Sequence, residues 1–173
     1  MKLSDGVEQA ILSMLVLAGL SETGVLSATA LAEFHGVSPS YLLKHLQALA
    51  GAGLLQSVPG PKGGYRLARD PEKITLLDVV LAVEGPEPAF RCSEIRKRGP
   101  SPVAAHFFKT PCAVNAAMLK AERAYRAELR KVAIADLLKT SDAALGKAIE
   151  HRVCGFLELN ERSRSTATQG VSR

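Results

Sequence analysis

The stretch LAEFHGVSPSYLLKHLQALAGAGLLQSVPGPKGGYRLAR, residues 31–69, decides the fold of this 173-residue chain. It contains two helical patterns separated by the tight turn His35-Gly36-Val37, and a glycine in this place is a typical helix stop. The second pattern begins with Ser38 as a cap and Pro39 at the first helical position. Its leucines recur at the spacing of one buried helix face: Leu42, Leu46 and Leu49. The stretch predicts a helix-turn-helix.

The end of the same stretch has the pattern of a β-hairpin. LLQSV (54–58) suits a strand, PGPKGG (59–64) supplies turn residues, and Tyr65 and Leu67 alternate with Arg66 on the return. A helix-turn-helix followed at once by a hairpin is the layout of a winged helix. Residues 4–20 and TLLDVVLAVEG (75–85) add a helical pattern on either side, and Thr75 is a candidate cap.

Composition and charge limit the classes of protein. The first 80 residues contain six basic and seven acidic side chains, and the remaining residues contain sixteen basic and ten acidic ones. The net charge of the predicted DNA-binding part therefore does not by itself indicate a nucleic-acid-binding protein. Residues 54–69, however, contain three basic side chains and no acid. We find no nucleophile elbow, phosphate-binding loop or zinc-protease motif, and therefore expect neither an enzyme nor a small-molecule substrate.

The apolar start of the chain is interrupted by Asp5 and Glu8, and no cleavage site follows it. We therefore expect a folded helix, with no signal peptide and no membrane partner. A soluble cytoplasmic protein is the resulting expectation, and three cysteines in a reducing compartment favour metal or redox roles over structural disulfides.

The winged-helix pattern predicts which side chains meet duplex DNA. The second helix of the motif lies in the major groove and presents its N-terminal side chains to the bases. Hairpin cations are expected to reach the neighbouring backbone or minor groove, and two glycines let the hairpin turn tightly and approach the duplex. The predicted DNA-binding residues are Lys2, Ser38, Ser40, Tyr41, Lys44, Lys62, Gly63, Gly64 and Arg66.

The pattern changes after residue 85. Prolines and the basic cluster Arg96-Lys97-Arg98 mark residues 86–111 as a loop, and an alanine-rich helix is expected to run from about 111 to 135 and to pack against its copy in a homodimer. The predicted fold is mainly α with a small β-hairpin wing: a winged helix-turn-helix plus a long dimerisation helix. Its expected divisions are a DNA-binding domain (1–85), a sensor loop (86–111), a dimerisation helix with a C-terminal helical segment (112–160) and a disordered tail (161–173).

These motifs also carry a family resemblance. MKLSDGVEQA, residues 31–55, PGPKGGYRLAR and ITLLDVVLAVEG together resemble the winged-helix regulators typified by the iron-sulfur cluster regulator IscR and the nitric-oxide-sensing repressor NsrR, over roughly residues 1–135. The resemblance implies a homodimeric transcription factor, usually a repressor, whose DNA affinity is often set by a cluster or small signal. Many members hold the cluster with three cysteines close together. Here Arg98 and Ala104 occupy the places of the second and third.

GVE, EFHGV, AFRCSEIRKRGP and PCAVNAAM resemble the redox-sensing RsrR-like subgroup, which implies mixed ligation of a [2Fe–2S] cluster across the dimer. Carried over, the ligands are Cys92 and Cys112 of one subunit with Glu8 and His35 of the other. The residues themselves leave alternatives open: a zinc site of the same four side chains, a Cys92–Cys112 thiol switch, or ordinary structural roles. Cys154 lies outside the resemblance and receives no role.

Overall fold

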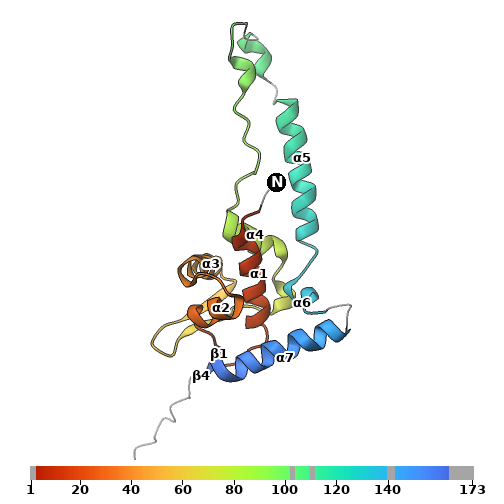
Figure 1. Ribbon diagram of the computed structural model, residues 1–173. Helices are drawn as coiled ribbons and strands as arrows, with labels where there is room; N and C mark the ends of the chain where they lie inside the picture. Colours follow the sequence, from red (N-terminus) through yellow and green to blue (C-terminus); the bar gives the residue numbers. More distant parts are fainter. Residues whose placement is uncertain (1–2, 102–103, 110–111, 140–142, 164–173) are drawn as a thin grey trace, which may run out of the picture.

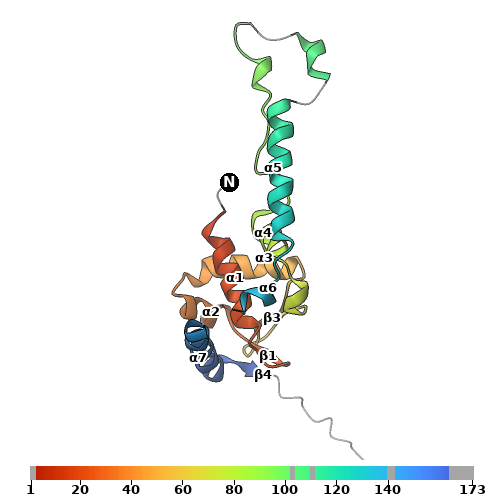
Figure 2. The same ribbon diagram turned by 90° about the vertical axis from the view of Figure 1, so that its right-hand side faces the viewer.

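The computed structural model describes residues 3–101, 104–109, 112–139 and 143–163. Its helices gather into a body, from which a long arm projects in both views (Figures 1 and 2). The arm consists of the loop after residue 84 and the helix α5 (Ala113–Leu129) that returns beside it. The predicted fold class is confirmed: the chain is mainly helical and contains a small antiparallel hairpin.

The body is built on four helices around one apolar core. They are α1 (Asp5–Leu17), α2 (Ala28–His35), α3 (Pro39–Gly51) and α4 (Leu76–Glu84). The predicted leucine stripe of α3 is fully buried and packs with Met14 of α1, Leu31 of α2 and Val79 of α4. The opposite face of α3 is exposed, as a recognition helix requires.

Local signals in the sequence set most helix ends. Ser27 caps α2 by accepting from the Ala30 amide, and Gly36 ends it in the left-handed conformation at φ 67°. Thr75 and Asp78 form a capping box at α4. Ser38 takes the N-cap position of α3 but does not cap it, because its hydroxyl lies 3.1 Å from that of Ser40.

The hairpin pairs β2 (Leu55–Val58) with β3 (Gly64–Leu67), with Leu55 opposite Leu67 and Val58 opposite Gly64. A side chain at Gly63 would meet the Val58 carbonyl oxygen at 2.0 Å, and one at Gly64 would meet the Leu26 carbonyl oxygen at 2.2 Å. Gly63 is therefore required by the close approach within the hairpin, and Gly64 by the close approach of the hairpin to Leu26.

The arm carries two short 3-10 turns, η2 (Ile95–Lys97) and η3 (Ala105–Lys109), before α5 begins. A third, η1 (Pro71–Lys73), precedes α4 in the body. Helix α5 ends at Leu129, earlier than the expected residue 135, because the chain turns back there. The Leu76 amide donates a hydrogen bond to the Val132 carbonyl, and the Ile134 amide donates one to the Ile74 carbonyl. These bonds place the short helix α6 (Ile134–Leu137) against the body.

The chain then crosses the body as α7 (Ala143–Asn160), and β4 (Arg162–Ser163) pairs antiparallel with β1 (Gly24–Val25). Residues 161–163, which we expected to begin a disordered tail, are thus part of the fold. Within the described ranges no helix is both long and apolar enough to span a membrane.

Candidate metal centre and nucleic-acid interface

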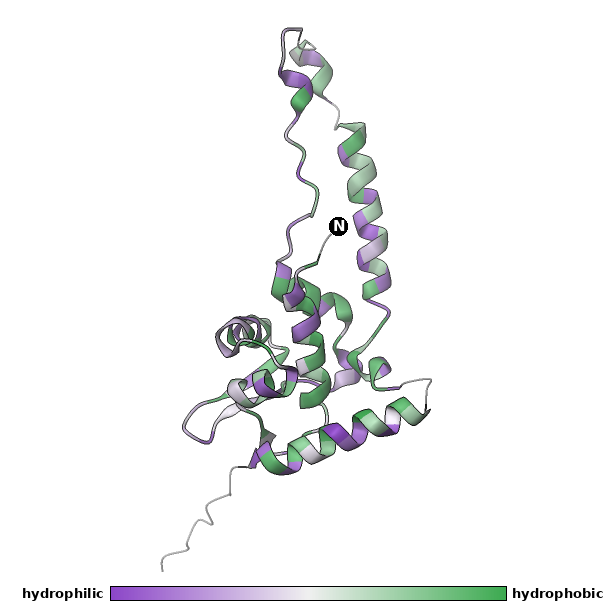
Figure 3. Cartoon of the chain, viewed as in Figure 1, coloured by the Kyte–Doolittle hydropathy of each residue, from purple (hydrophilic) through white to green (hydrophobic). Residues whose placement is uncertain are grey.

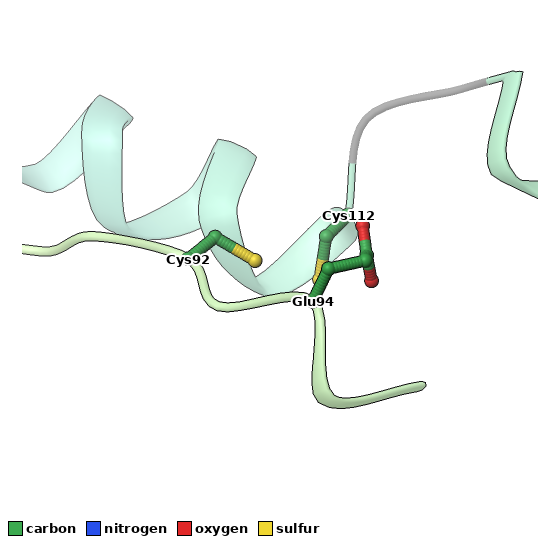
Figure 4. Close-up of side chains that lie close together, drawn as sticks. All are labelled: Cys92, Glu94 and Cys112. Carbon is green, nitrogen blue, oxygen red and sulfur yellow. The ribbon is translucent and has the colours of Figure 1, made fainter. Parts of the chain in front are cut away.

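Three side chains with metal-binding atoms meet in the arm. The sulfurs of Cys92 and Cys112 and a carboxylate oxygen of Glu94 lie within 4.8 Å of one another. Cys92 and Glu94 lie on the extended segment that passes the first turn of α5, where Cys112 occupies the N-cap position (Figure 4). In the described part of the chain, this is the one group of three or more histidine, cysteine or acidic side chains close enough to hold a metal ion.

A buried carboxylate on α5 holds the two sides of the arm together. Glu122 accepts a hydrogen bond from the Ala89 amide at 3.0 Å and forms an ion pair with Arg126 at 2.6 Å. Arg126 also donates to the carbonyl oxygens of Pro86 and Glu87. From this anchor, three extended residues lead to Cys92 and under three helical turns lead to Cys112, about 10 and 15 Å respectively. The anchor thereby holds the segment that carries Cys92 beside α5, whose N-cap position is Cys112.

The surroundings of the cysteines favour a thiolate. A backbone hydrogen bond from Asn115, in the first turn of α5, lowers the pKa of the Cys112 thiol. The Arg96 guanidinium lowers it further. Arg96 also binds Glu94, with 2.9 Å between one of its terminal nitrogens and the second carboxylate oxygen, and this contact lowers the pKa of that carboxyl. Both Cys112 and Glu94 are thus biased toward the charged form that binds cations.

Glu94 was missed from the sequence, although CSE places it two residues after Cys92. Its backbone has φ 49°, and it is the only non-glycine residue with positive φ in the described ranges. Such a conformation costs about 1–3 kcal/mol and persists where the surroundings enforce it. Functional sites are where such strain is concentrated, which is consistent with a role for this turn.

The other two predicted ligands lie in the body. Glu8 is exposed on α1 beside an apolar groove formed by Leu3, Val7, Ile11 and Leu12. His35 ends α2, and its buried Nε2 atom has no hydrogen-bond partner among the residues that the structure describes. Desolvation, assisted by the Arg152 charge, lowers the pKa of His35, so the neutral imidazole that binds metals is favoured. Within one chain neither residue joins the cysteines, because α1 and α2 lie in the body and α5 begins at the far end of the arm (Figure 1).

The predicted reading face of α3 is exposed. Ser38, Ser40 and Lys44 are open to solvent, and the residue Tyr41 is 42% exposed. Tyr41 stacks edge-on against His45, with ring centroids 4.6 Å apart. His45 is buried against Gly6 of α1, where an added Cβ would lie 2.3 Å from the imidazole. The orientation of Tyr41 is therefore linked to the packing of α1 on α3.

The wing presents its cations unequally. Lys62 is exposed in the turn, whereas Arg66 is partly buried and donates to the Gln56 side chain at 2.8 Å and to the Glu22 carbonyl at 3.2 Å. Arg69 donates to the carbonyls of Gly53 and Ala52. Lys2, the remaining predicted contact, lies outside the described residues.

Comparison with solved structures recovers this architecture. IscR of T. potens superposes with a TM-score of 0.59 at 26% identity, covering 83% of this chain and 90% of that one. The oxidised form of CymR from Staphylococcus aureus gives the same TM-score and identity, covering 83% of this chain and all of CymR.

Sequence comparison points the same way. YffB of Lactococcus lactis, described as an HTH-type transcriptional regulator, is 47% identical over 85 residues, or 49% of this chain and 54% of YffB. IscR of Klebsiella pneumoniae is 38% identical over 92 residues, or 53% of this chain and 56% of IscR. The chain thus spans little more than half the length of these relatives.

The Rrf2 family profile, described as iron-dependent transcriptional regulators, matches residues 3–140. This match covers the helix-turn-helix, the wing and the whole arm. The chain belongs to the Rrf2 family of transcriptional regulators.

Proposed function

We propose that the protein is a homodimeric DNA-binding transcriptional regulator of the cytoplasm, a repressor of the RsrR-like type, which senses redox state through a [2Fe–2S] cluster bridging its subunits. The observation that carries the proposal is the meeting of Cys92 and Cys112 at the end of an arm. Two thiolates are half of the four protein ligands that such a cluster takes, and the donor set fits half a site. Glu8 and His35 of the second subunit would complete it.

The exposed face of α5 supports the dimer. Val114 and Met118 are 61% and 45% exposed, and several alanines of the same helix are also open to solvent. Hydropathy colouring shows apolar residues along the length of α5, away from the body (Figure 3). Apolar helix faces of this kind are commonly covered by a second subunit.

The proposed ligands are linked to the DNA-reading helix in two ways, one through the chain itself and one through packing. His35 is followed at once by the turn that starts α3, and Gly6, half a turn before Glu8, packs on His45 of α3. When bound, the cluster supplies one-electron redox chemistry. A change of position at either ligand residue would therefore shift α3. A coupling free energy of about 1.4 kcal/mol between the redox state of the cluster and DNA binding changes the DNA affinity about tenfold.

A thiol switch is the second candidate, favoured by the lowered pKa of Cys112 and by the closeness of Cys92. Each thiol would lose one proton and one electron to an oxidant, and the two sulfurs would form a disulfide. A zinc site is the third candidate, since two thiolates and a carboxylate can supply three of the four ligands of a tetrahedral zinc ion. These candidates differ in colour and metal content.

The test is anaerobic purification followed by visible absorption and by iron and sulfide counts per dimer. A symmetric homodimer contains two such sites, so we expect about four irons and four sulfides per dimer, and loss of the colour in Cys92→Ala and in Cys112→Ala. Cys154→Ala is the matched control, because Cys154 is an exposed cysteine on α7 away from the site. A colourless, iron-free protein that still responds to oxidant would replace the cluster by the thiol switch.

Two carboxylates compete for the fourth ligand position. We expect Glu8→Ala to reduce the iron content and Glu94→Ala to leave it unchanged. The opposite result would assign Glu94 as the ligand and contradict carboxylate ligation from the second subunit. DNA affinity, measured by fluorescence anisotropy on oxidised and reduced protein, tests the regulation itself: equal affinities would contradict redox sensing.

A further inference from the structure

The C-terminal segment Ala143–Ser163 lies beyond residue 140, where the family profile ends, yet it is docked firmly on the DNA-binding body. Leu157 is buried in the core. The Phe156 ring packs on that of Phe34 with centroids 4.6 Å apart. The Arg152 guanidinium lies over the Phe34 ring and donates a hydrogen bond to the backbone carbonyl of Phe34 at 2.9 Å. The segment therefore has a fixed path across α1 and α2.

This path ends at the wing. In β4, Arg162 pairs with Val25 and Ser163 with Gly24 of β1. The next residue, Leu26, exchanges two backbone hydrogen bonds with Tyr65 of β3, at 3.1 and 2.7 Å. Glu161 fixes the approach by accepting from the Ser21 amide at 3.1 Å. The strand β4 is thus connected through β1 to the hairpin that forms the wing.

Arg162 places an additional cation at the turn of the wing. One of its terminal nitrogens donates to the Pro61 carbonyl at 3.1 Å, next to Lys62 in sequence, and the Arg162 residue remains exposed. The neighbouring acid Glu161 is engaged with Ser21. Arg66, by contrast, donates hydrogen bonds from two guanidinium nitrogens to acceptors within the protein, the Gln56 side chain and the Glu22 carbonyl. The exposed charge of the wing turn therefore comes from Lys62 and Arg162 together.

We propose that β4 extends the DNA-binding surface and that Arg162 contacts a backbone phosphate of duplex DNA beside the wing. The proposal rests on the proposed DNA-binding function. An exposed arginine keeps several donors free after one bond to a carbonyl, and arginine is a preferred phosphate partner. Such a contact carries no base specificity but fixes the position of the wing on the duplex.

The experiment measures DNA affinity against salt concentration. The probe is a fluorescein-labelled duplex recovered with the wild-type protein by in vitro selection from a random pool. Each phosphate contact contributes about 0.9 to the slope of log affinity against log salt. Because a homodimer carries two Arg162 side chains, we expect Arg162→Gln to reduce the slope by about 1.8 and to weaken binding about thirtyfold near 0.15 M salt. Lys147→Gln, which removes an exposed charge at the start of α7, should leave both unchanged.

Arg162→Lys separates a phosphate contact from a brace for the turn. It keeps the charge, so we expect a slope close to that of the wild type. If Arg162→Lys instead loses as much of the salt slope as Arg162→Gln, the proposal of a phosphate contact is wrong. It is also wrong if Arg162→Gln has the same slope and affinity as Lys147→Gln. If the wild-type protein recovers no duplex at all, the proposed DNA-binding function fails first. Thermal melting of each variant confirms that only folded protein is compared.

Discussion

The body and the arm of this chain are stabilised in different ways. The body buries about twenty apolar side chains from α1–α4, β1–β3, α6 and α7 in its core. In the arm, among described residues 85–129, the only buried residue is the carboxylate Glu122. Burial of apolar surface contributes far more to stability than a few hydrogen bonds and an ion pair, so we expect the arm to be less stable than the body unless the proposed second subunit covers it. The proposed DNA-binding part therefore has an apolar core of its own, and the proposed sensor arm has none among its described residues.

The largest effect is expected in the core of the body. Leu46→Ala removes a fully buried side chain of α3 and should lower the free energy of unfolding by about 2–5 kcal/mol, since a cavity remains. Urea unfolding measures it. Leu159→Ala, an exposed leucine on α7, is the control and should change stability by about 0.5 kcal/mol or less. Equal losses would contradict the assignment of the core.

The next effect concerns the anchor of the arm. Glu122→Ala leaves the Ala89 amide and Arg126 without their partner and should destabilise the arm by about 1–3 kcal/mol. We expect faster hydrogen exchange at the Ala89 amide and slower disulfide formation between Cys92 and Cys112 in the iron-free protein carrying Cys154→Ser. Glu128→Ala, an exposed acid on the same helix, should change neither. Unchanged exchange in Glu122→Ala would show that the anchor is dispensable.

A smaller effect is expected at the exposed face of α5. Met118→Glu places a charge in the proposed dimer interface and should weaken dimerisation at least about tenfold, or about 1.4 kcal/mol. Lys120→Glu, about 200° around the same helix, should not. Sedimentation velocity over a dilution series measures both. A Met118→Glu protein that dimerises like the wild type would place the interface elsewhere.

The smallest effect is a pH dependence of the body. Desolvation, together with the Lys44 charge, lowers the pKa of His45 below 6.5, although the Glu84 charge opposes this. The unfolded state then binds more protons at acidic pH, so the stability is complete above pH 6.5 and declines as pH falls through 6.5 toward the folded pKa. Thermal melting between pH 7.5 and 5.5 should show a shallower decline in His45→Gln than in the wild type. His151→Gln, at an exposed histidine, should keep the wild-type decline.

Much of the body could be predicted because its signals are local. The Ser27 and Thr75 caps, the left-handed Gly36 and the leucine stripe of α3 each depend on residues within one or two turns. The hairpin likewise follows from a dense turn sequence between two short strands. Ser38 shows the limit of such signals, since its hydroxyl turned to Ser40 instead of the helix end.

The candidate site was only partly predictable. Cys92 and Cys112 could be singled out as residue types, but their meeting requires the loop to return beside α5, where Glu122, 30 residues beyond Cys92, binds the Ala89 amide. Glu94 joins them because its backbone takes a left-handed turn, which a glutamate rarely adopts and no sequence pattern indicates. The ligation by Glu8 and His35 stays a prediction.

The winged helix-turn-helix, the resemblance to the regulator family and the helix with an exposed apolar face could all be predicted from local sequence patterns. Periodicity, caps and turn residues act over a few positions, so they can be read directly. Three features became visible only in the folded chain: residues 162–163 return to the wing, α5 stops at Leu129, and Cys92, Glu94 and Cys112 meet in the arm. Those contacts join distant parts of the chain, and they form only after the local elements have packed.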